Sequence, residues 1–326
     1  MKKFIVLLLS LCFLVSTLGG CAIFGEEQKD TGAIKVYCPD GAPAIAIAEM
    51  LGGKNVGGQT AEFNIVSSSQ ITNFVQKTNA LADVAILPLN AAVKICGSGE
   101  TYQMVTVLTH GNLYIVSDEE IALSDLVGKK VGVIGQGLVP DKTLKAVLTK
   151  NGIPFEASNE EIDGKVALSY YGSGEELMPA MKNDKIKIGL LPEPAATKIV
   201  TKLNTGYTYR LNLGELYDAQ TGGYPQAVMV VKKSLSKDVV NALINQVKNA
   251  IDYALDDVNA EAVVNAVNAN LVDGVVASLD SFVTADVINR CGIYYQDAVS
   301  ARVSVDNYLT AIGEQKTLDN FIYGLN

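Results

Sequence analysis

The stretch IKVYCPDGAPAIAIAEML, residues 34–51, decides the fold. Ile34 to Cys38 predicts a short buried strand, Pro39-Asp40-Gly41 a turn, and Ala44 to Leu51 an apolar helix that Pro43 opens. The same succession of apolar strand, turn and helix recurs after strands predicted at 62–66 and 84–87. Short strands that alternate with helices indicate βαβ units and a parallel sheet.

The pattern restarts in the second half of the chain. Two further strands are predicted at 102–108 and 113–117, and strand–turn–helix units then follow strands at 130–134, 166–171 and 188–191. A strand at 226–231 leads into the longest helix, 236–256, whose apolar residues keep the spacing of one helix face. The chain therefore predicts two successive α/β units followed by a helical C-terminal part.

The first twenty-one residues have the features of a secretory signal. Lys2 and Lys3 precede the apolar run Phe4 to Val15, which is shorter than the ~20 residues that span a membrane. Leu18-Gly19-Gly20-Cys21 resembles the lipobox of bacterial lipoproteins, which implies that Cys21 is lipidated and becomes the mature N-terminus. An ordinary signal peptide with a chance cysteine is the alternative.

The segment after this cysteine is short, polar and charged. Residues 21–32 cannot bury much apolar area, so we predict a flexible tether. Together with a signal peptide at 1–20, this places the body at the outer face of a bacterial cytoplasmic membrane, held by lipid on Cys21.

Composition narrows the classes of function. The 326 residues are 48% hydrophobic and carry a formal charge of −9, which argues against nucleic acid as a partner. The single histidine, His110, excludes a multi-histidine metal site, and we predict no metal and no cofactor. Cys38, Cys96 and Cys291 form either one disulfide plus a free thiol or three buried free thiols.

Several blocks resemble, in the same order, those of type II periplasmic binding proteins, in the group that serves sulfonate, nitrate and thiamine-precursor ABC importers. The blocks are residues 36–44, 82–86, 126–133, 135–137, 191–195 and 224–228. The resemblance implies an α/β fold of two lobes joined by two crossovers, near 117–123 and 222–226. Lobe 1 would contain 33–117 plus 224–326, and lobe 2 would contain 118–223, with ligand in the cleft between them.

The position of the predicted site also follows from the elements. In open α/β sheets, ligands bind outside the carboxyl ends of the strands, and turns that open helices offer N–H groups to oxygen atoms. The residues predicted to bind ligand are Asp40, Gly41, Ala42, Ser67, Ser68, Ser69, Pro88, Asn90, Gly111, Asn112, Gln136, Gly137, Leu138, Glu193 and Tyr224.

Several of these residues have a simpler explanation. Ser67 to Ser69 can only cap a helix, Asp40 can be a turn residue, Glu193 can be a helix-dipole partner, and Tyr224 can be a core-edge residue. The Gly135-Gln136-Gly137 turn has Pro140 where a dinucleotide fingerprint needs its third glycine, so nucleotide binding is not predicted.

The function that combines these features is a monomeric solute-binding lipoprotein that captures a small polar molecule and delivers it to ABC permease subunits. One alternative is a ligand-sensing or adhesion lipoprotein without a permease. Another is a pyrimidine-synthase-like enzyme, but the chain has no cysteine cluster, GxSxG or HExxH motif, so we predict that it is not an enzyme. The acids favour a cationic ligand and the helix N-termini favour an anionic or carbonyl group, which leaves the ligand open.

Overall fold

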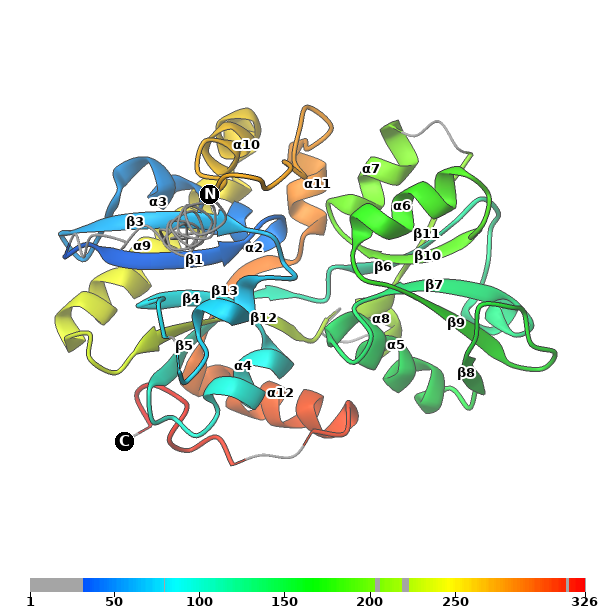
Figure 1. The fold of residues 1–326 in the computed structure, drawn as a ribbon, viewed down its shortest axis with the longest axis horizontal. Coiled ribbons are helices and arrows are strands. Elements are labelled where there is room, and N and C mark those ends of the chain that lie inside the picture. Colours follow the sequence, from blue (N-terminus) through cyan, green and yellow to red (C-terminus); the bar gives the residue numbers. More distant parts are fainter. Residues whose placement is uncertain (1–31, 79, 203–205, 219–222, 315–316, 326) are drawn as a thin grey trace, which may run out of the picture. The chain divides into compact units, whose positions relative to one another are not determined.

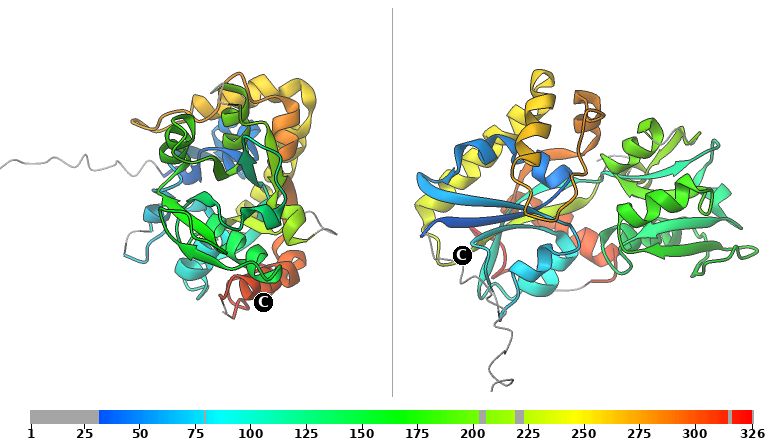
Figure 2. Two further views of the ribbon diagram at one scale, coloured as in Figure 1. Left: turned by 90° about the vertical axis from the view of Figure 1, so that its right-hand side faces the viewer. Right: turned by 45° about the horizontal axis from the view of Figure 1, so that its top comes forward.

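The computed structural model describes residues 32–78, 80–202, 206–218, 223–314 and 317–325. The predictions for the signal peptide, for Cys21 and for the tether up to residue 31 lie outside the described residues. The body contains two β-sheets with helices on both faces of each (Figure 1). Figure 2 gives two further directions of view.

The first sheet has seven strands in the order β13-β5-β12-β4-β1-β3-β2. Strand β1 runs parallel to β3 and β4, whereas β12 is antiparallel to both β4 and β5. The strands are β1 (Ile34–Pro39), β2 (Asn55–Val56), β3 (Gln59–Val66), β4 (Val84–Pro88), β5 (Tyr102–His110), β12 (Pro225–Lys232) and β13 (Ile293–Asp297). This sheet forms lobe 1.

The second sheet has six strands in the order β11-β6-β10-β7-β9-β8 and forms lobe 2. Strand β7 is parallel to β10 and β9, whereas β6 is antiparallel to β10 and β11. The strands are β6 (Leu113–Ser117), β7 (Lys130–Ile134), β8 (Phe155–Ala157), β9 (Val166–Tyr171), β10 (Ile188–Pro192) and β11 (Tyr209–Asn212). The periodicity predicts β6 as a strand, but it does not reveal that β6 pairs in the second sheet.

The helices differ from the prediction in three places. The helix predicted at 44–51 consists of two short helices, α2 and α3, interrupted at Ala46 and Ile47. The helix predicted at 70–77 is only a 3-10 turn, η1 (Ile71–Phe74). The helix predicted at 281–290 begins at Ala285.

The remaining helices follow the order of the chain. Their bounds are α2 (Ala42–Ile45), α3 (Ala48–Gly53), α4 (Leu89–Cys96), η2 (Leu123–Leu126), α5 (Val139–Lys150), α6 (Gly174–Lys182), α7 (Ala195–Lys202), α8 (Leu213–Tyr217), α9 (Lys237–Leu255), η3 (Asp257–Asn259), α10 (Ala260–Asn268), α11 (Ala285–Arg290) and α12 (Ala298–Ala311). None of the helices in these described ranges combines the length and apolar composition needed to cross a membrane.

The chain crosses between the sheets at two neighbouring places. It leaves β5 and enters β6 through Gly111 and Asn112, and it returns into β12 at Pro225. The N–H of Gly111 donates to the carbonyl of Tyr224 at 3.0 Å, so the two crossovers are bonded to each other. The first crossover thus lies earlier than predicted because β6 belongs to lobe 2.

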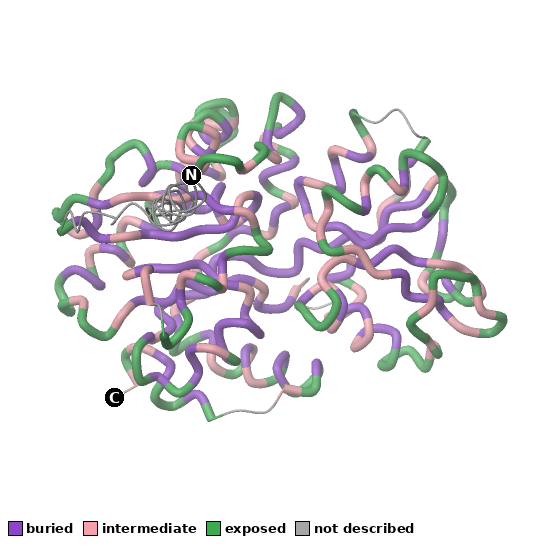
Figure 3. The backbone as a smooth tube through the Cα atoms, viewed as in Figure 1, coloured by how far each residue is buried: buried purple, intermediate pink, exposed green. Residues whose placement is uncertain are grey.

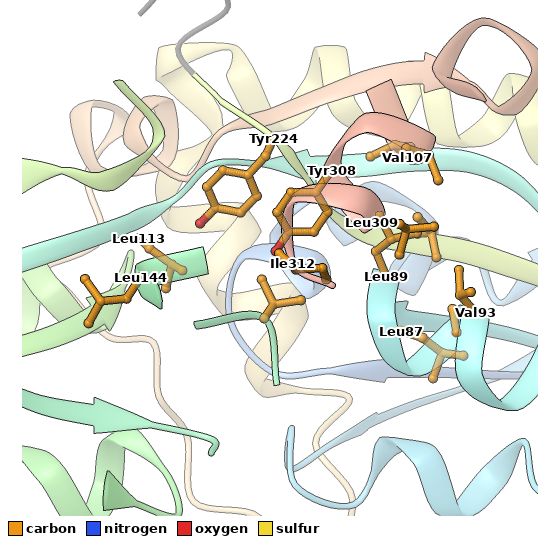
Figure 4. Packing of buried hydrophobic residues seen from close by; sticks show 14 of the residues in the cluster. Leu87, Leu89, Val93, Val107, Leu113, Leu144, Tyr224, Tyr308, Leu309 and Ile312 are labelled. Atoms are coloured by element: carbon orange, nitrogen blue, oxygen red, sulfur yellow. The ribbon is translucent and has the colours of Figure 1, made fainter. Parts of the chain in front are cut away.

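Apolar packing connects the two lobes at one face. The strands and inner helix faces are buried (Figure 3), and one cluster continues from lobe 1 into lobe 2 around Leu89, Leu113, Leu144 and Tyr308 (Figure 4). The hydroxyl groups of Tyr308 on α12 and Thr143 on α5 are hydrogen-bonded at 2.6 Å. Burial of this kind contributes roughly 25 cal/mol per Å² of apolar surface, so the two lobes share part of one core.

Candidate functional site at the strand ends

Asn90 connects the turns of the two lobes. It lies in the first turn of α4, directly after β4, and is 6% exposed. Its Nδ2 donates to the carbonyl of Gly137 in the turn after β7, at 3.2 Å. Its Oδ1 is buried and has no hydrogen-bond partner among the described residues. Because an unsatisfied buried acceptor is costly, this oxygen is the atom here that most needs a ligand.

We call the turns 40–42, 67–69, 88–90 and 135–138 the strand-end site. They follow β1, β3, β4 and β7, so the topology places each at the carboxyl end of a strand, as the sequence predicts. Pro88 is the last residue of β4 and the N-cap of α4. The contact between Asn90 and Gly137 shows that turns from both lobes meet here.

Asp40 holds a loop of lobe 1 in place. Its Oδ1 accepts from the N–H of Gly41 at 2.7 Å, and its Oδ2 accepts from the N–H of Ser278 at 2.9 Å. The carbonyl of Ser278 accepts from Nζ of Lys198 on α7, at 3.4 Å, so this loop also reaches lobe 2. The Oγ of Ser278 is buried without a protein partner among the described residues. The carboxylate of Asp40 is therefore engaged, while a neighbouring hydroxyl is not.

The serine turn does not cap a helix. The hydroxyl groups of Ser67 and Ser69 are 3.0 Å apart and bond to each other. The 3-10 turn that follows has Gln70 at its N-cap position, with no side-chain cap. Ser68 and Ser69 are exposed. The capping explanation for these serines is therefore wrong, and their hydroxyl groups stay predicted ligand contacts.

The turn before α5 already contains an anion. The N–H of Gly137 donates to Oδ2 of Asp141 at 2.8 Å, and the hydroxyl of Tyr170 donates to Oδ1 at 2.9 Å. A carboxylate is favourable in the first turn of a helix, and Lys145 pairs with it at 2.9 Å. A ligand anion at this N-terminus would meet a buried negative charge. Gln136 and Leu138 are exposed at the same turn, Leu138 at 42%.

Glu193 is enclosed by protein groups. It is 1% exposed. Its Oε2 accepts from the N–H of Thr197 at 2.9 Å, in the first turn of α7, and its Oε1 accepts from the Thr197 hydroxyl at 2.8 Å. Nε of Arg290, which ends α11 in lobe 1, donates to the same Oε1 at 3.0 Å. Glu193 therefore has the predicted alternative role at a helix N-terminus, and it also forms an ion pair between the lobes.

Asn112 and Tyr224 lie at the crossovers. The N–H of Asn112 donates to Oε1 of Gln226 on β12 at 3.2 Å, and its Nδ2 donates to the carbonyl of Glu193 at 3.3 Å. The ring of Tyr224 is 2% exposed and stacks on Tyr308 at 5.0 Å between centroids. The structure therefore places both side chains in the packing of the crossovers, apart from the strand-end turns.

Sequence reasoning misses the residues that bridge the lobes. Ser278, Lys198 and Arg290 lie in a loop or at helix ends and carry no motif. One signal is available: the chain has only three arginines, among 26 basic residues. Arginine is preferred over lysine where a planar fork binds two partners, and Arg290 does this with Glu193 and Thr197.

The buried thiols are unreactive. Cys38, Cys96 and Cys291 are free, which decides the open question of pairing. Burial raises the pKa of Cys96 to about 12 and raises the pKa values of Cys38 and Cys291 well above their usual value. These groups therefore stay protonated at neutral pH. Among the described residues, no group of three or more His, Cys, Asp or Glu side chains is arranged to hold a metal.

Comparison with known proteins identifies the fold. No protein-family model and no curated protein matches the chain. Among solved structures, an ABC transporter protein from Parabacteroides distasonis is 19% identical, with a TM-score of 0.73 over 90% of this chain and 99% of that one. The periplasmic aliphatic sulphonate binding protein SsuA from Escherichia coli is 12% identical, with a TM-score of 0.63 over 89% and 92%.

A third similar structure is the zinc-bound ligand-binding component of an ABC-type import system from Staphylococcus aureus. It is 13% identical, with a TM-score of 0.60 over 89% of this chain and 96% of that one. At such identities the likeness concerns the fold. The chain has the two-lobed α/β fold of type II periplasmic binding proteins, as the sequence predicts.

Proposed function

We propose that this protein is an extracytoplasmic solute-binding lipoprotein that captures a small polar molecule at the strand-end site and delivers it to an ABC permease. The observation that carries the proposal is Asn90. Its amide nitrogen joins the two lobes while its buried Oδ1 has no protein partner among the described residues. Solute-binding components of ABC importers share this fold, which supports the same role here.

The charges of the site favour a neutral or weakly charged donor. Asn90 offers an acceptor, and the hydroxyl groups of Ser68, Ser69 and Ser278 both donate and accept. Asp40 and Asp141 are engaged by backbone N–H groups. We infer that the ligand presents an N–H or O–H group to Oδ1 of Asn90 and an apolar part to the exposed side chain of Leu138.

We further propose that the protein is anchored by lipid on Cys21. The lipobox and the polar segment after it support this. Changing Cys21 to Ala should move the protein from the membrane fraction to the soluble fraction and should abolish labelling with palmitate. A variant that stays in the membrane fraction would exclude lipid on this cysteine as the sole anchor.

The non-enzymatic role also belongs to this proposal. It is supported by the binding proteins that share the fold and by the protonated state of the buried thiols. A sensing lipoprotein without a permease would bind ligand equally well. Transport assays in cells that lack the protein separate the two roles, because only a permease partner makes solute uptake depend on it.

The test of the site is a ligand screen followed by one substitution. Sulfonates, pyrimidines, amino acids and polyamines are screened by the rise in unfolding temperature, since a ligand at a hundredfold excess over its Kd stabilises by about 2.7 kcal/mol. Asn90→Ala should then weaken binding of the compound found by roughly five- to a hundredfold. The control is Asn183→Ala, an exposed amide that bonds only locally, to Pro179. Equal affinity in the two variants would exclude Asn90 from the site.

A further inference from the structure

A second cavity lies between the edge strands of the two lobes. It has a volume of about 680 Å³ and is lined from lobe 1 by residues of α11 and β13 and from lobe 2 by residues of β11 and α8. Strands β13 and β11 are end strands of their sheets. No residue of the strand-end turns lines this cavity, which we call the edge-strand pocket. Its volume is in the range of small-molecule sites.

Two of the three arginines of the chain line this pocket. Arg210 comes from β11 of lobe 2, and its buried Nε has no hydrogen-bond partner among the described residues. Arg290 comes from α11 of lobe 1. Both guanidinium groups donate to the hydroxyl of Thr197, at 3.4 and 3.1 Å. The pocket therefore has an unused, buried N–H donor on a cationic side chain.

The acids nearby leave the guanidinium groups short of a partner. The buried carboxylate of Glu193 pairs with Arg290 at 3.0 Å. Glu215 also lines the pocket, but it is exposed and its carboxylate accepts from Nδ2 of Asn212 at 3.1 Å. Burial lowers the pKa of Arg210 and the charge of Glu193 raises it, and an arginine stays charged in either case. One half-buried positive charge is therefore left to pair with a bound anion.

The other wall of the pocket offers an aromatic surface. The ring of Tyr294 on β13 stacks on His110 with centroids 3.4 Å apart, and Tyr294 is 46% exposed. Tyr114 also lines the cavity. Flat apolar groups stack favourably on such rings. An occupant that satisfies both walls carries an anionic group and a planar or apolar body.

We propose that the edge-strand pocket binds a small organic acid, with its carboxylate or sulfonate on Arg210 and Arg290 and its body against Tyr294. This site is separate from the strand-end site and does not depend on the ligand bound there. Because Arg210 and Arg290 belong to different lobes, one bound oxyanion contacts both.

The experiment uses four probes that share one ring. Benzoate and benzenesulfonate carry the anion, benzamide is neutral and benzylamine is cationic. Binding to the folded chain is followed by calorimetry and by the NMR signal of His110, the only histidine. We expect the two acids to bind at millimolar concentration or below and to shift the His110 signal. The amide and the amine should bind more weakly by about tenfold or more, since the charge-assisted hydrogen bonds are missing.

Three arginine variants locate the binding. Arg210→Gln should weaken benzoate binding about tenfold or more, and Arg210→Lys, which keeps the charge but not the planar fork, should weaken it less. The matched control is Arg302→Gln, which removes the same charge from an exposed position on α12 and should leave affinity unchanged. Unfolding curves verify that each variant is folded.

Four results would overturn the proposal. They are no binding of either acid at millimolar concentration, equal binding of benzylamine, equal affinity in Arg210→Gln and Arg302→Gln, or loss of binding in Asn90→Ala with retention in Arg210→Gln. The last result would place the acid at the strand-end site.

Discussion

The strand-end site and the edge-strand pocket both lie where the lobes meet, but they are built from different groups. The strand-end site consists of turns, short polar side chains and backbone groups, and its acids are engaged by N–H groups. The edge-strand pocket is built from long side chains of α11, β11 and β13, including two arginines. The first suits a neutral donor and the second suits an anion.

The difference teaches how each kind of site depends on the fold. A turn after a parallel strand is brought to the sheet edge by topology alone. The guanidinium groups of Arg210 and Arg290 meet only because an edge strand of one lobe faces a helix end of the other. The lobe arrangement therefore matters more for the edge-strand pocket than for the individual turns.

The largest effect is expected from His110, which lines the edge-strand pocket. Burial lowers its pKa from 6.5 to about 4, and its Nε2 lies 3.2 Å from Oε1 of Gln296. Between these two values the unfolded chain binds a proton and the folded chain does not. The contribution to stability is therefore complete above pH 6.5 and is lost as pH falls toward 4, by about 3 kcal/mol.

Urea unfolding at pH 7 and at pH 4.5 measures this effect. The variant His110→Asn should lose less stability over that interval than the wild type, and the single histidine signal in NMR should titrate near pH 4. Titration near pH 6.5 would mean that the pocket wall around His110 is wet and loosely packed.

The next effect concerns the ion pair that separates the two regions. Arg290→Ala leaves Glu193 buried with Thr197 as its remaining partner. Breaking a fully buried pair costs about 3–5 kcal/mol, but the side chain of Arg290 is 33% exposed, so we expect a loss of about 2 kcal/mol. Urea unfolding of Arg290→Ala and of the exposed control Arg302→Ala measures it. Equal losses would mean that water already screens this pair.

A smaller effect is expected at the strand-end site itself. Asp40→Ala removes the acceptor for the N–H groups of Gly41 and Ser278. The structure therefore predicts a loss of stability of about 1–2 kcal/mol, together with faster hydrogen exchange at Ser278. If the empty protein keeps its stability, Asp40 is a ligand contact rather than a loop anchor.

The sequence predicts the fold to a large extent because local patterns determine it. Ile34 to Cys38 forms β1, Val84 to Leu87 lies within β4, and Ser236 caps α9 through the N–H of Val239. The pairing of β6 is not predictable in this way, because an apolar strand fits either sheet. Strands β11 and β13 escape detection because Tyr209–Asn212 and Ile293–Asp297 are short and partly polar.

The site is predicted less completely than the fold. Asn90 and the turn at Gly137 follow from topology, and their hydrogen bond supports their place together. The state of each acid does not follow, because Asp40 and Glu193 find partners at Ser278 and Arg290, which lie far away in the sequence. Long-range partners of this kind decide whether a polar residue in a turn is available to a ligand.

Hydrogen exchange with and without the solute that the screen identifies tests the central claim most directly. The account predicts that ligand slows exchange together in turns of both lobes, at 40–42, 67–69 and 88–90 in lobe 1 and at 135–138 in lobe 2, and that Asn90→Ala abolishes this protection. Protection confined to one lobe, or to the edge-strand pocket around Arg210 and Tyr294, would contradict a ligand site at the strand ends.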